Sequence, residues 1–281
     1  MPSATLSSTS YGKSRIRLVQ VSRHGDRHDV RDLTVAIAFE GDYDTSYTDG
    51  DNRDMLPTDT MKNTVYALAA RDGAAEPEGF GMLLGGHFLD RNPKLSRVTV
   101  DLIDHGWSHI ADGAREHGQA FVRRGPEART AQVVCDRRGV SVIAGVTDLI
   151  IMKTSRSAFA GFPRDEYTTL PETSDRLLAT ALTATWSYHD TEVEFGPMFR
   201  TVRAALLDAF AVHDSLSVQH TLYAMAEVVL NMIDPVDSIS LEMPNRHHLP
   251  VDLSRFGLEN RNEIFVATEE PYGLIKATLS R

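Results

Sequence analysis

Five short polar stretches of the sequence carry side chains that could do chemistry. They are YGK with Lys13, the pair Thr58-Asp59, the segment 157–176 with Phe159 and Arg176, SVQH with Val218 and Gln219, and PNRHH with Asn245 and His247. Taken singly, each has an ordinary structural explanation: a solvated lysine, a helix cap, a loop aromatic, a helix start and a strand end. The elements around them must therefore decide between structure and chemistry.

Thr58-Asp59 places a hydroxyl beside a carboxylate, directly after Leu56-Pro57. Thr and Asp are favoured helix N-caps, and apolar residues follow at helical spacing, so the pattern predicts a helix over 58–72. The reciprocal capping box is missing, because position N3 is Met61 or Lys62 rather than Glu or Gln. A cap and a chemical group both remain open for Thr58.

Other motifs that suggest chemistry are incomplete. In GFGMLLGG (79–86), Leu84 stands where a phosphate-binding GxGxxG needs its third glycine. The pairs His24/His28 and His105/His109 have the spacing of metal ligands on a helix, but both lie in predicted strands or turns. The single cysteine, Cys135, excludes a thiolate zinc site and an internal disulfide. The sequence thus predicts neither a metal nor an organic cofactor.

Composition sets further bounds on function. The net charge of -10 argues against binding nucleic acid, which needs a basic surface. No apolar run approaches the roughly 18 residues that cross a membrane. The N-terminus lacks the apolar core of a signal peptide, so residues 1–10 are expected to form a loose tail and the protein to be cytoplasmic.

Predicted elements occur in the same order twice. Strand patterns at 15–21 and 32–39 precede helices at 58–72 and about 78–90, and strands follow around 96–103, 119–124 and 129–135. The second set comprises strands at 140–153 and 177–188, helices around 195–210 and 218–232, and strands at 238–243 (ended by Pro244), 263–268 and 273–280. This repeated ββααββ order predicts an α+β fold with helices on one face of antiparallel sheets, in two domains, 11–138 and 139–281. Exposed sheet edges make a homo-oligomer the expected state.

The five polar stretches, in this order, resemble urate oxidase (uricase), a family of the tunnelling-fold superfamily. The motifs that carry the resemblance run nearly from Tyr11 to Arg281: YGKSRIRLVQV, TDTMKNTVYALA, GFPRDEYTTLPETSDR, SVQHTLYAMAE, MPNRHHLPVDL and PYGLIKATLSR. The resemblance implies two tunnelling-fold domains per chain and a homotetramer that encloses a tunnel. It also implies active sites at subunit interfaces and oxidation of urate by O2, without metal or cofactor, to 5-hydroxyisourate and H2O2.

The resemblance also implies how urate is bound. Phe159 would stack on the flat purine, Arg176 would pair with two acceptors, and the Gln219 amide would recognise the ring edge. Backbone N–H groups of Val218 and Asp59 would add donors at helix starts. Thr58 and Asp59 would come from one subunit, and Phe159, Arg176, Val218 and Gln219 from its neighbour.

Lys13, Thr58 and His247 are implied as a proton relay. A desolvated Lys13 would draw a proton from the Thr58 hydroxyl, and His247 would refill the relay near neutral pH. Asn245 and Thr58 would hold O2, then peroxide, then water above the urate plane.

Two other functions remain possible on the sequence. A zinc-dependent tunnelling-fold enzyme acting on pterins would need Cys and His ligands that this chain does not supply. A non-catalytic purine-binding or scaffolding tetramer would keep Phe159, Arg176 and Gln219 but would not need Lys13 and His247. The sequence also lacks the peroxisomal C-terminal tripeptide of eukaryotic relatives, which favours a bacterial cytoplasmic enzyme.

Overall fold

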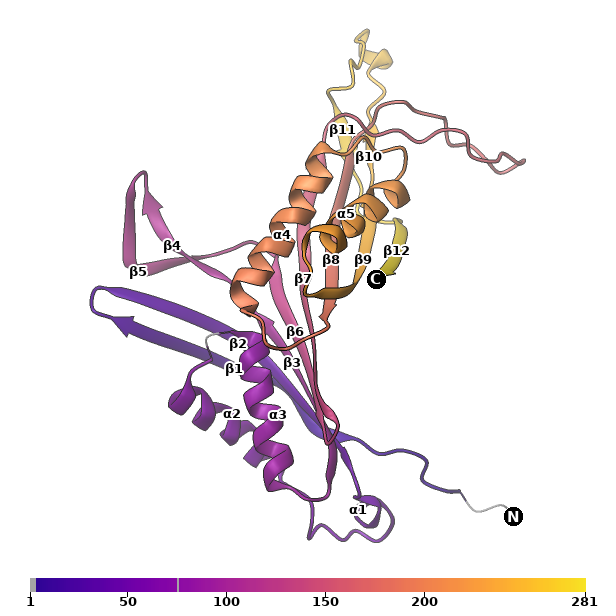
Figure 1. Ribbon diagram of the computed structural model, residues 1–281. Coiled ribbons are helices and arrows are strands. Elements are labelled where there is room, and N and C mark those ends of the chain that lie inside the picture. Colours follow the sequence, from indigo (N-terminus) through magenta and orange to yellow (C-terminus); the bar gives the residue numbers. More distant parts are fainter. Residues whose placement is uncertain (1–3, 75) are drawn as a thin grey trace. The chain divides into compact units, whose positions relative to one another are not determined.

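The computed structural model describes residues 4–74 and 76–281, and the chain divides into two compact units (Figure 1). The first unit extends to Gly145 and includes Asp190–Gly196, and the second consists of Val146–His189 and Pro197–Arg281. The expected domain boundary, 138/139, falls at the start of strand β7, whereas the division between the units falls inside this strand. Residues 1–3 of the expected tail lie outside the described residues, and residues 4–10 form neither helix nor strand.

The first unit has antiparallel strands with two long helices on one face of the sheet. Its elements are β1 (Tyr11–His24), β2 (Arg27–Gly41), α1 (Asp44–Thr48), α2 (Thr58–Asp72), α3 (Pro77–Arg91), β3 (Leu95–Asp104), β4 (Trp107–Asp112), β5 (Arg115–Arg123) and β6 (Ala128–Asp136). The main sheet has the order β1-β2-β3-β6, and β4 and β5 form a separate hairpin. Helix α3 contacts β3 and β6, and α2 contacts β1.

The second unit repeats this arrangement. Its elements are β7 (Gly139–Lys153), which begins in the first unit, then β8 (Leu178–Tyr188), α4 (Phe195–Val212), α5 (Val218–Met232), β9 (Val236–Arg246), β10 (His248–Pro250), η1 (Ser254–Phe256), β11 (Phe265–Ala267) and β12 (Gly273–Ser280). The strand order is β7-β8-β9-β12, and β10 pairs with β11 in a short second sheet. The predicted α+β class and the repeated ββααββ order are therefore confirmed.

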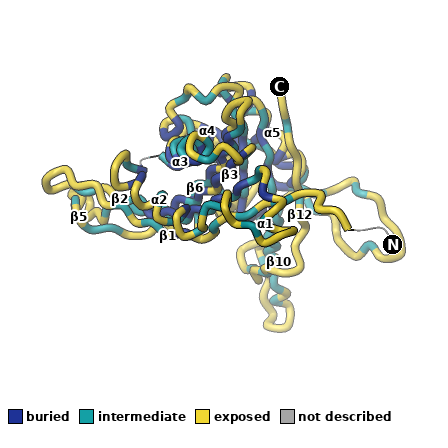
Figure 2. Tube along the Cα trace, turned by 90° about the horizontal axis from the view of Figure 1, so that it is seen from below, coloured by how far each residue is buried: buried dark blue, intermediate teal, exposed yellow. Residues whose placement is uncertain are grey.

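The core of each unit lies between the helices and one face of the sheet. In β3 the residues alternate between buried and less buried, as expected for a strand with one face against helices. Met61, Val65 and Leu68 form the buried stripe of α2, which is the helical spacing that predicted this element. Figure 2 shows the same contrast, with buried residues at intervals along β3 and β6 and mainly exposed residues in β5.

Strand β1 approaches β2 so closely that Gly12 has no room for a side chain. A Cβ atom at this position would lie 1.9 Å from the carbonyl oxygen of Ile37. The register of the β1–β2 pair then shifts between Lys13 and Ile16, which marks a bulge next to Lys13. Lys13 was expected just before the first strand, but it lies inside β1, at a place where bulges commonly redirect a side chain.

Four other expectations differ from the structure. Helix α1 and strand β4 were not predicted, because neither has a clear apolar repeat.

The strand expected to end at Pro244 continues to Arg246. The pairs between β8 and β9 run from Ala179–Arg246 to Thr180–Asn245 and resume only at Thr183–Glu242. Because Pro244 has no N–H to donate, the ladder between β8 and β9 is interrupted beside it. The strand itself continues beyond this gap. Thr58 is the first residue of α2, as the predicted helix start requires, but the N-cap is Pro57 and no side chain caps this helix, so the cap that was left open for Thr58 is not formed.

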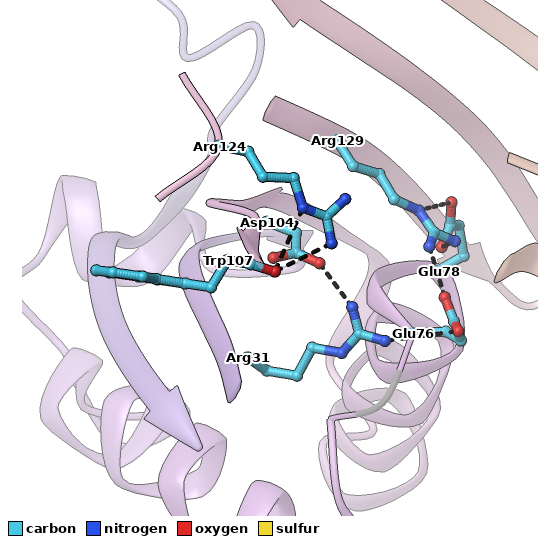
Figure 3. A network of polar contacts seen from close by, with 7 residues as sticks. All are labelled: Arg31, Glu76, Glu78, Asp104, Trp107, Arg124 and Arg129. Atoms are coloured by element: carbon cyan, nitrogen blue, oxygen red, sulfur yellow. Dashed lines mark hydrogen bonds and ion pairs between the residues drawn. The ribbon is translucent and has the colours of Figure 1, made fainter. Parts of the chain in front are cut away.

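A network of charged side chains fastens the start of α3 to the sheet of the first unit (Figure 3). The Arg129 guanidinium donates to Glu78 at 2.6 and 3.3 Å and to Glu76 at 2.6 Å. Arg31 lies 3.7 Å from Glu76 and donates to Asp104 at 3.0 Å. The Glu78 side chain is fully buried, and this burial raises the pKa of its carboxyl, while the neighbouring Arg129 acts in the opposite direction. The network thus supplies partners to a carboxylate that would be costly to bury alone.

Within the described residues, no helix is both long and apolar enough to cross a lipid bilayer.

Candidate active site

The second unit contains a cavity of about 490 Å³, a size typical of small-molecule sites. It is lined by six of the residues proposed from the sequence: Phe159, Arg176, Val218, Gln219, Asn245 and His247. These residues come from the segment between β7 and β8, from the start of α5 and from the end of β9. The fold thus gathers three separate sequence stretches around one space.

Phe159 and Arg176 lie at the two ends of a long arm without helix or ladder. Backbone hydrogen bonds join Phe159 and Thr173 in both directions, at 2.8 and 3.0 Å, and the Arg176 amide donates to the carbonyl of Ser157 at 2.8 Å. The Arg176 guanidinium carbon then lies 5.2 Å from the centre of the Phe159 ring. These ties place a cation and an aromatic face side by side in the cavity wall.

Arg176 has lost water without gaining a partner. Its Nε atom is buried and has no hydrogen bond, and no carboxylate pairs with this guanidinium among the described residues. Burial lowers the pKa of Arg176, because desolvation disfavours the charged form. A half-buried cation without an ion-pair partner is suited to an anionic ligand with two adjacent acceptors.

The first turn of α5 presents Val218 and Gln219 to the cavity. Ser217 is the N-cap, and its hydroxyl accepts from the amide of His220 at 3.1 Å. The Val218 and Gln219 amides have no acceptor in the preceding turn, as at every helix start, so they are available to a ligand. The sequence prediction of a helix start here is confirmed.

The loop before α5 is fixed from two sides. The Ser215 amide donates to the carbonyl of Arg156 at 3.0 Å, and the Ala158 amide donates to the Ser215 carbonyl at 2.7 Å. Buried Lys153 donates to the carbonyls of Phe210 and His213 at the end of α4, and burial lowers the pKa of this lysine. The arm that carries Phe159 and the helix that carries Gln219 are therefore joined by backbone and lysine hydrogen bonds.

Asn245 and His247 complete the cavity wall from the end of β9. Asn245 lies within the strand, and the carbonyl of His247 accepts from the Thr268 amide at 2.9 Å just beyond it. In the described part of the chain, the polar side chains of Gln219, Asn245 and His247 make no hydrogen bond to another residue. The cavity thus exposes an amide pair and an imidazole that are uncommitted.

The remaining predicted residues, Lys13, Thr58 and Asp59, lie in the first unit. Lys13 is close enough to lower the pKa of Asp59, although the hydrogen bond from Lys62, at 2.5 Å, is the main cause of that shift. Asn63 also donates to Asp59, at 3.0 Å. The Thr58 hydroxyl has no hydrogen bond within the described residues, so this group remains available. Strand β1 thus places the amine of Lys13 near the start of α2, where Thr58 and Asp59 supply a hydroxyl and a carboxylate.

Further residues line the cavity that the sequence did not single out. They are mainly Leu170, His248, Pro250, Asn262, Phe265 and Ile275. Leu170 and His248 lie within two of the five polar stretches, 157–176 and 244–248, so the sequence had already indicated these segments as parts of a site. Asn262 lies between η1 and β11, and Phe265 begins β11, and no pattern in this part of the sequence predicts a place in the cavity wall. No group of three or more potential metal-ligating side chains occurs in residues 4–74 and 76–281.

Known proteins resemble this chain over almost its whole length. The family model for uricase matches residues 9–134 and 142–276. A uricase of Arthrobacter globiformis is 42% identical over 276 residues, which is 98% of this chain and 90% of that protein. A uricase of Dictyostelium discoideum is 37% identical over 282 residues, 99% of this chain and 98% of that protein.

Solved structures agree with these sequence matches. The crystal structure of uricase from Arthrobacter globiformis has a TM-score of 0.95 at 42% identity, covering 100% of this chain and 96% of the other. The two repeated α+β units seen here therefore have the fold of a solved uricase. With the family model matching nearly the whole sequence and relatives above 30% identity along its length, the chain belongs to the uricase family.

Proposed function

We propose that this protein is a urate oxidase that binds urate in the cavity of its second unit and needs a neighbouring subunit to complete the site. The observation that carries the proposal is the half-buried guanidinium of Arg176, whose buried Nε has no hydrogen-bond partner and which lies without a carboxylate partner over the ring of Phe159 in a cavity of about 490 Å³. An aromatic face beside an unpaired cation suits a flat, anionic purine.

Each wall of the cavity has a different part in binding. Phe159 stacks on the purine, and the Arg176 fork donates two parallel hydrogen bonds to neighbouring acceptors on its edge. The Gln219 side chain has a donor and an acceptor, which pair with an acceptor and a donor on the edge of the purine ring. The Val218 backbone amide adds a donor at the N-terminus of α5, the positive end of the helix dipole. Urate is thereby held by its plane, its charge and its edge at once.

Lys13, Thr58 and His247 form the proton relay of this proposal. Removing a second proton from the urate monoanion makes the ring electron-rich enough to react with O2. Lys13 takes the proton of the Thr58 hydroxyl, which in turn exchanges protons with the ligand or with a molecule above its plane. The support is that Lys13 lies near enough to act on the carboxylate of Asp59, the residue that follows Thr58, and that the Thr58 hydroxyl is not used in a helix cap.

The reaction balances without a further reactant. One electron passes from the urate dianion to O2, the two radicals combine at C5 as a peroxide, and water replaces the peroxide there. Urate, O2 and H2O thus give 5-hydroxyisourate and H2O2. Asn245 and Thr58 hold O2, then peroxide, then water over the ring.

The complete site contains residues of two subunits in this proposal. Thr58, Asp59 and Lys13 come from the first unit of one subunit, and the cavity residues come from the second unit of its neighbour. The terminal strands of the sheet order, β1 and β12, expose Val19 and Leu274, and such open edges favour pairing between copies of a chain. We propose a homotetramer on these grounds.

A direct assay tests the activity. Purified protein is mixed with urate in air, and the loss of urate absorbance and the release of H2O2 are followed together. We expect equal amounts of urate consumed and H2O2 formed. Tight binding of urate without turnover would instead support the purine-binding or scaffolding function.

Chelation tests the expected absence of a metal. Exhaustive treatment with EDTA or phenanthroline should leave the rate unchanged, and metal analysis should find no stoichiometric iron, copper or zinc. Loss of activity that a single added metal restores would contradict a cofactor-free reaction.

A further inference from the structure

We propose that Phe162 is a positioning residue for urate, because it supports the face of Phe159 that is turned away from the cavity. This inference rests on the proposed function and adds a residue to it. Phe162 lies three residues after Phe159 on the same arm, which contains Gly161 and Pro163. It was not among the residues that the sequence singled out.

The two rings are stacked. Their centres are 4.9 Å apart, and their planes differ by 16°, which is the offset-stacked arrangement that aromatic pairs prefer. The guanidinium carbon of Arg164 lies 5.4 Å from the centre of the Phe162 ring, on the outer part of the arm. Arg164, Phe162 and Phe159 therefore form a column that leads toward the cavity.

The cavity identifies which face of Phe159 is supported. Phe159 and Arg176 line it, whereas Phe162 and Arg164 do not belong to its described lining. Phe162 therefore lies behind Phe159 as seen from the ligand. A ligand that stacks on Phe159 meets a ring that is already held in its plane by a second ring.

Little else holds this part of the arm. Between β7 and β8 the described backbone pairing consists of the isolated bridges Ser157–Ser215 and Phe159–Thr173 and the bond from the Arg176 amide to the Ser157 carbonyl. Beyond Phe159, the Gly161 amide donates to the Glu172 carboxylate at 3.2 Å, and residues 165–168 bond only to one another. Tyr167 at the tip is 82% exposed. The backbone hydrogen bonds to Thr173 fix the chain at Phe159, whereas the ring itself is contacted by Arg176 on the cavity side and by the stacked ring of Phe162.

This geometry predicts an effect on binding rather than on chemistry. Without the second ring, Phe159 samples other rotamers, and urate has to order it on binding. An aromatic pair contributes enough to change affinity about 2- to 10-fold. The reacting groups are untouched, so KM should rise while kcat changes little.

The experiment compares Phe162→Leu with Phe162→Tyr and with Tyr167→Leu as a matched control on the same arm. Thermal unfolding and oligomer size are measured first, and Phe162→Met replaces the leucine variant if that variant does not assemble. Urate affinity is then measured by calorimetry under nitrogen, where no O2 is present, and KM and kcat are measured in air. We expect weaker binding and a higher KM, each about 2- to 10-fold, in Phe162→Leu only.

The outcomes separate this inference from the function on which it rests. Wild-type protein that neither binds urate under nitrogen nor consumes it in air would overturn both. Active wild-type protein with the same affinity in Phe162→Leu would overturn only the role of Phe162. Tighter urate binding by Phe162→Leu would also overturn it, because Phe162 would then compete with urate for the ring of Phe159. Retained affinity in Phe162→Tyr distinguishes support by an aromatic ring from the filling of space.

Discussion

Arg176 illustrates at the residue scale how burial prepares a site for its ligand. Its guanidinium is partly desolvated, its Nε atom lacks a partner, and its pKa is lowered by burial. A ligand that supplies two acceptors there regains the hydrogen bonds that folding removed. The surrounding Phe159 ring and Gln219 amide add shape and pattern but no compensating charge.

Replacement of Arg176 should therefore mainly affect binding. Arg176→Ala should weaken urate affinity under nitrogen by about 2–5 kcal/mol, the range for removing one partner of a desolvated charge pair. Arg176→Lys should recover only part of this loss, because an ammonium cannot form two parallel hydrogen bonds. Arg200→Ala, on the exposed surface of α4, serves as the control. Wild-type affinity in Arg176→Lys would show that recognition by a fork is wrong.

Lys13 and Thr58 should behave as one catalytic group. Lys13→Met and Thr58→Ala should each lower kcat by orders of magnitude, and the double variant should lose far less than the product of the two effects, since both changes break the same relay. Urate affinity under nitrogen should stay close to wild type in all three. Multiplicative losses in kcat would contradict a shared proton path.

Sequence patterns identified the elements better than the contacts between them. The helix over 58–72 was predicted with its observed limits, because its buried stripe is regular and Leu56-Pro57 precedes it. Strand β4 was missed, because its residues are half-buried or exposed and show no alternation. The bulge beside Lys13 depends on how Gly12 meets Ile37, and no local pattern reveals a contact between two strands.

The candidate site shows the same limit. Motif resemblance suggested nine residues, and the structure brings six of them into one cavity of the second unit and places the other three in the first unit. Phe162 was not predicted as a site residue, because its stacking on Phe159 depends on the backbone conformation of this segment. The salt-bridge partners of Glu78 were equally invisible, since Arg129 is separated from it by 51 residues in sequence.

The β1–β2 contact leads to a prediction about Gly12. Gly12→Ala would place a methyl group 1.9 Å from the Ile37 carbonyl oxygen, so the two strands must move apart. We expect a lower thermal unfolding midpoint and a lower kcat, because Lys13 moves with its strand. Gly86→Ala is the matched control, since an added Cβ in this part of α3 meets no atom within 4 Å. This control should instead gain about 0.5–1 kcal/mol from helix propensity. An unchanged kcat and unfolding midpoint in Gly12→Ala would contradict the close approach.

The network at the start of α3 predicts a dependence of stability on pH. Burial raises the pKa of Glu78 in the folded protein. A carboxyl group with a raised folded pKa favours folding most while it is protonated, and this contribution is lost as pH rises through the folded pKa. Glu78→Gln cannot ionise, so the difference in unfolding midpoint between wild type and this variant should shift in favour of the variant as pH rises from about 4.5 to 7. The opposite trend would mean that Arg129 outweighs burial.

At the scale of the whole molecule, the predicted site residues are divided between the two units. Lys13 and Thr58, which we propose as relay residues, lie in the first unit, and the cavity with Arg176 lies in the second. The chain is acidic overall, with a net charge of -10, so the attraction of a urate anion depends on local cations such as Arg176. Assembly in which the first unit of one subunit faces the second unit of another would supply both.

Complementation between two inactive variants tests this shared site most directly. Thr58→Ala and Arg176→Ala are co-expressed, and mixed tetramers are isolated by two different affinity tags. Random assortment should leave about one site in four with both residues intact, so the mixture should regain a corresponding fraction of wild-type activity. Co-expression of Thr58→Ala with Lys13→Met is the control, because both changes affect the same side of the site and every site keeps one defect. Activity in the first mixture and none in the second is the predicted result, whereas mixed tetramers of Thr58→Ala and Arg176→Ala that remain fully inactive would contradict an active site shared between subunits.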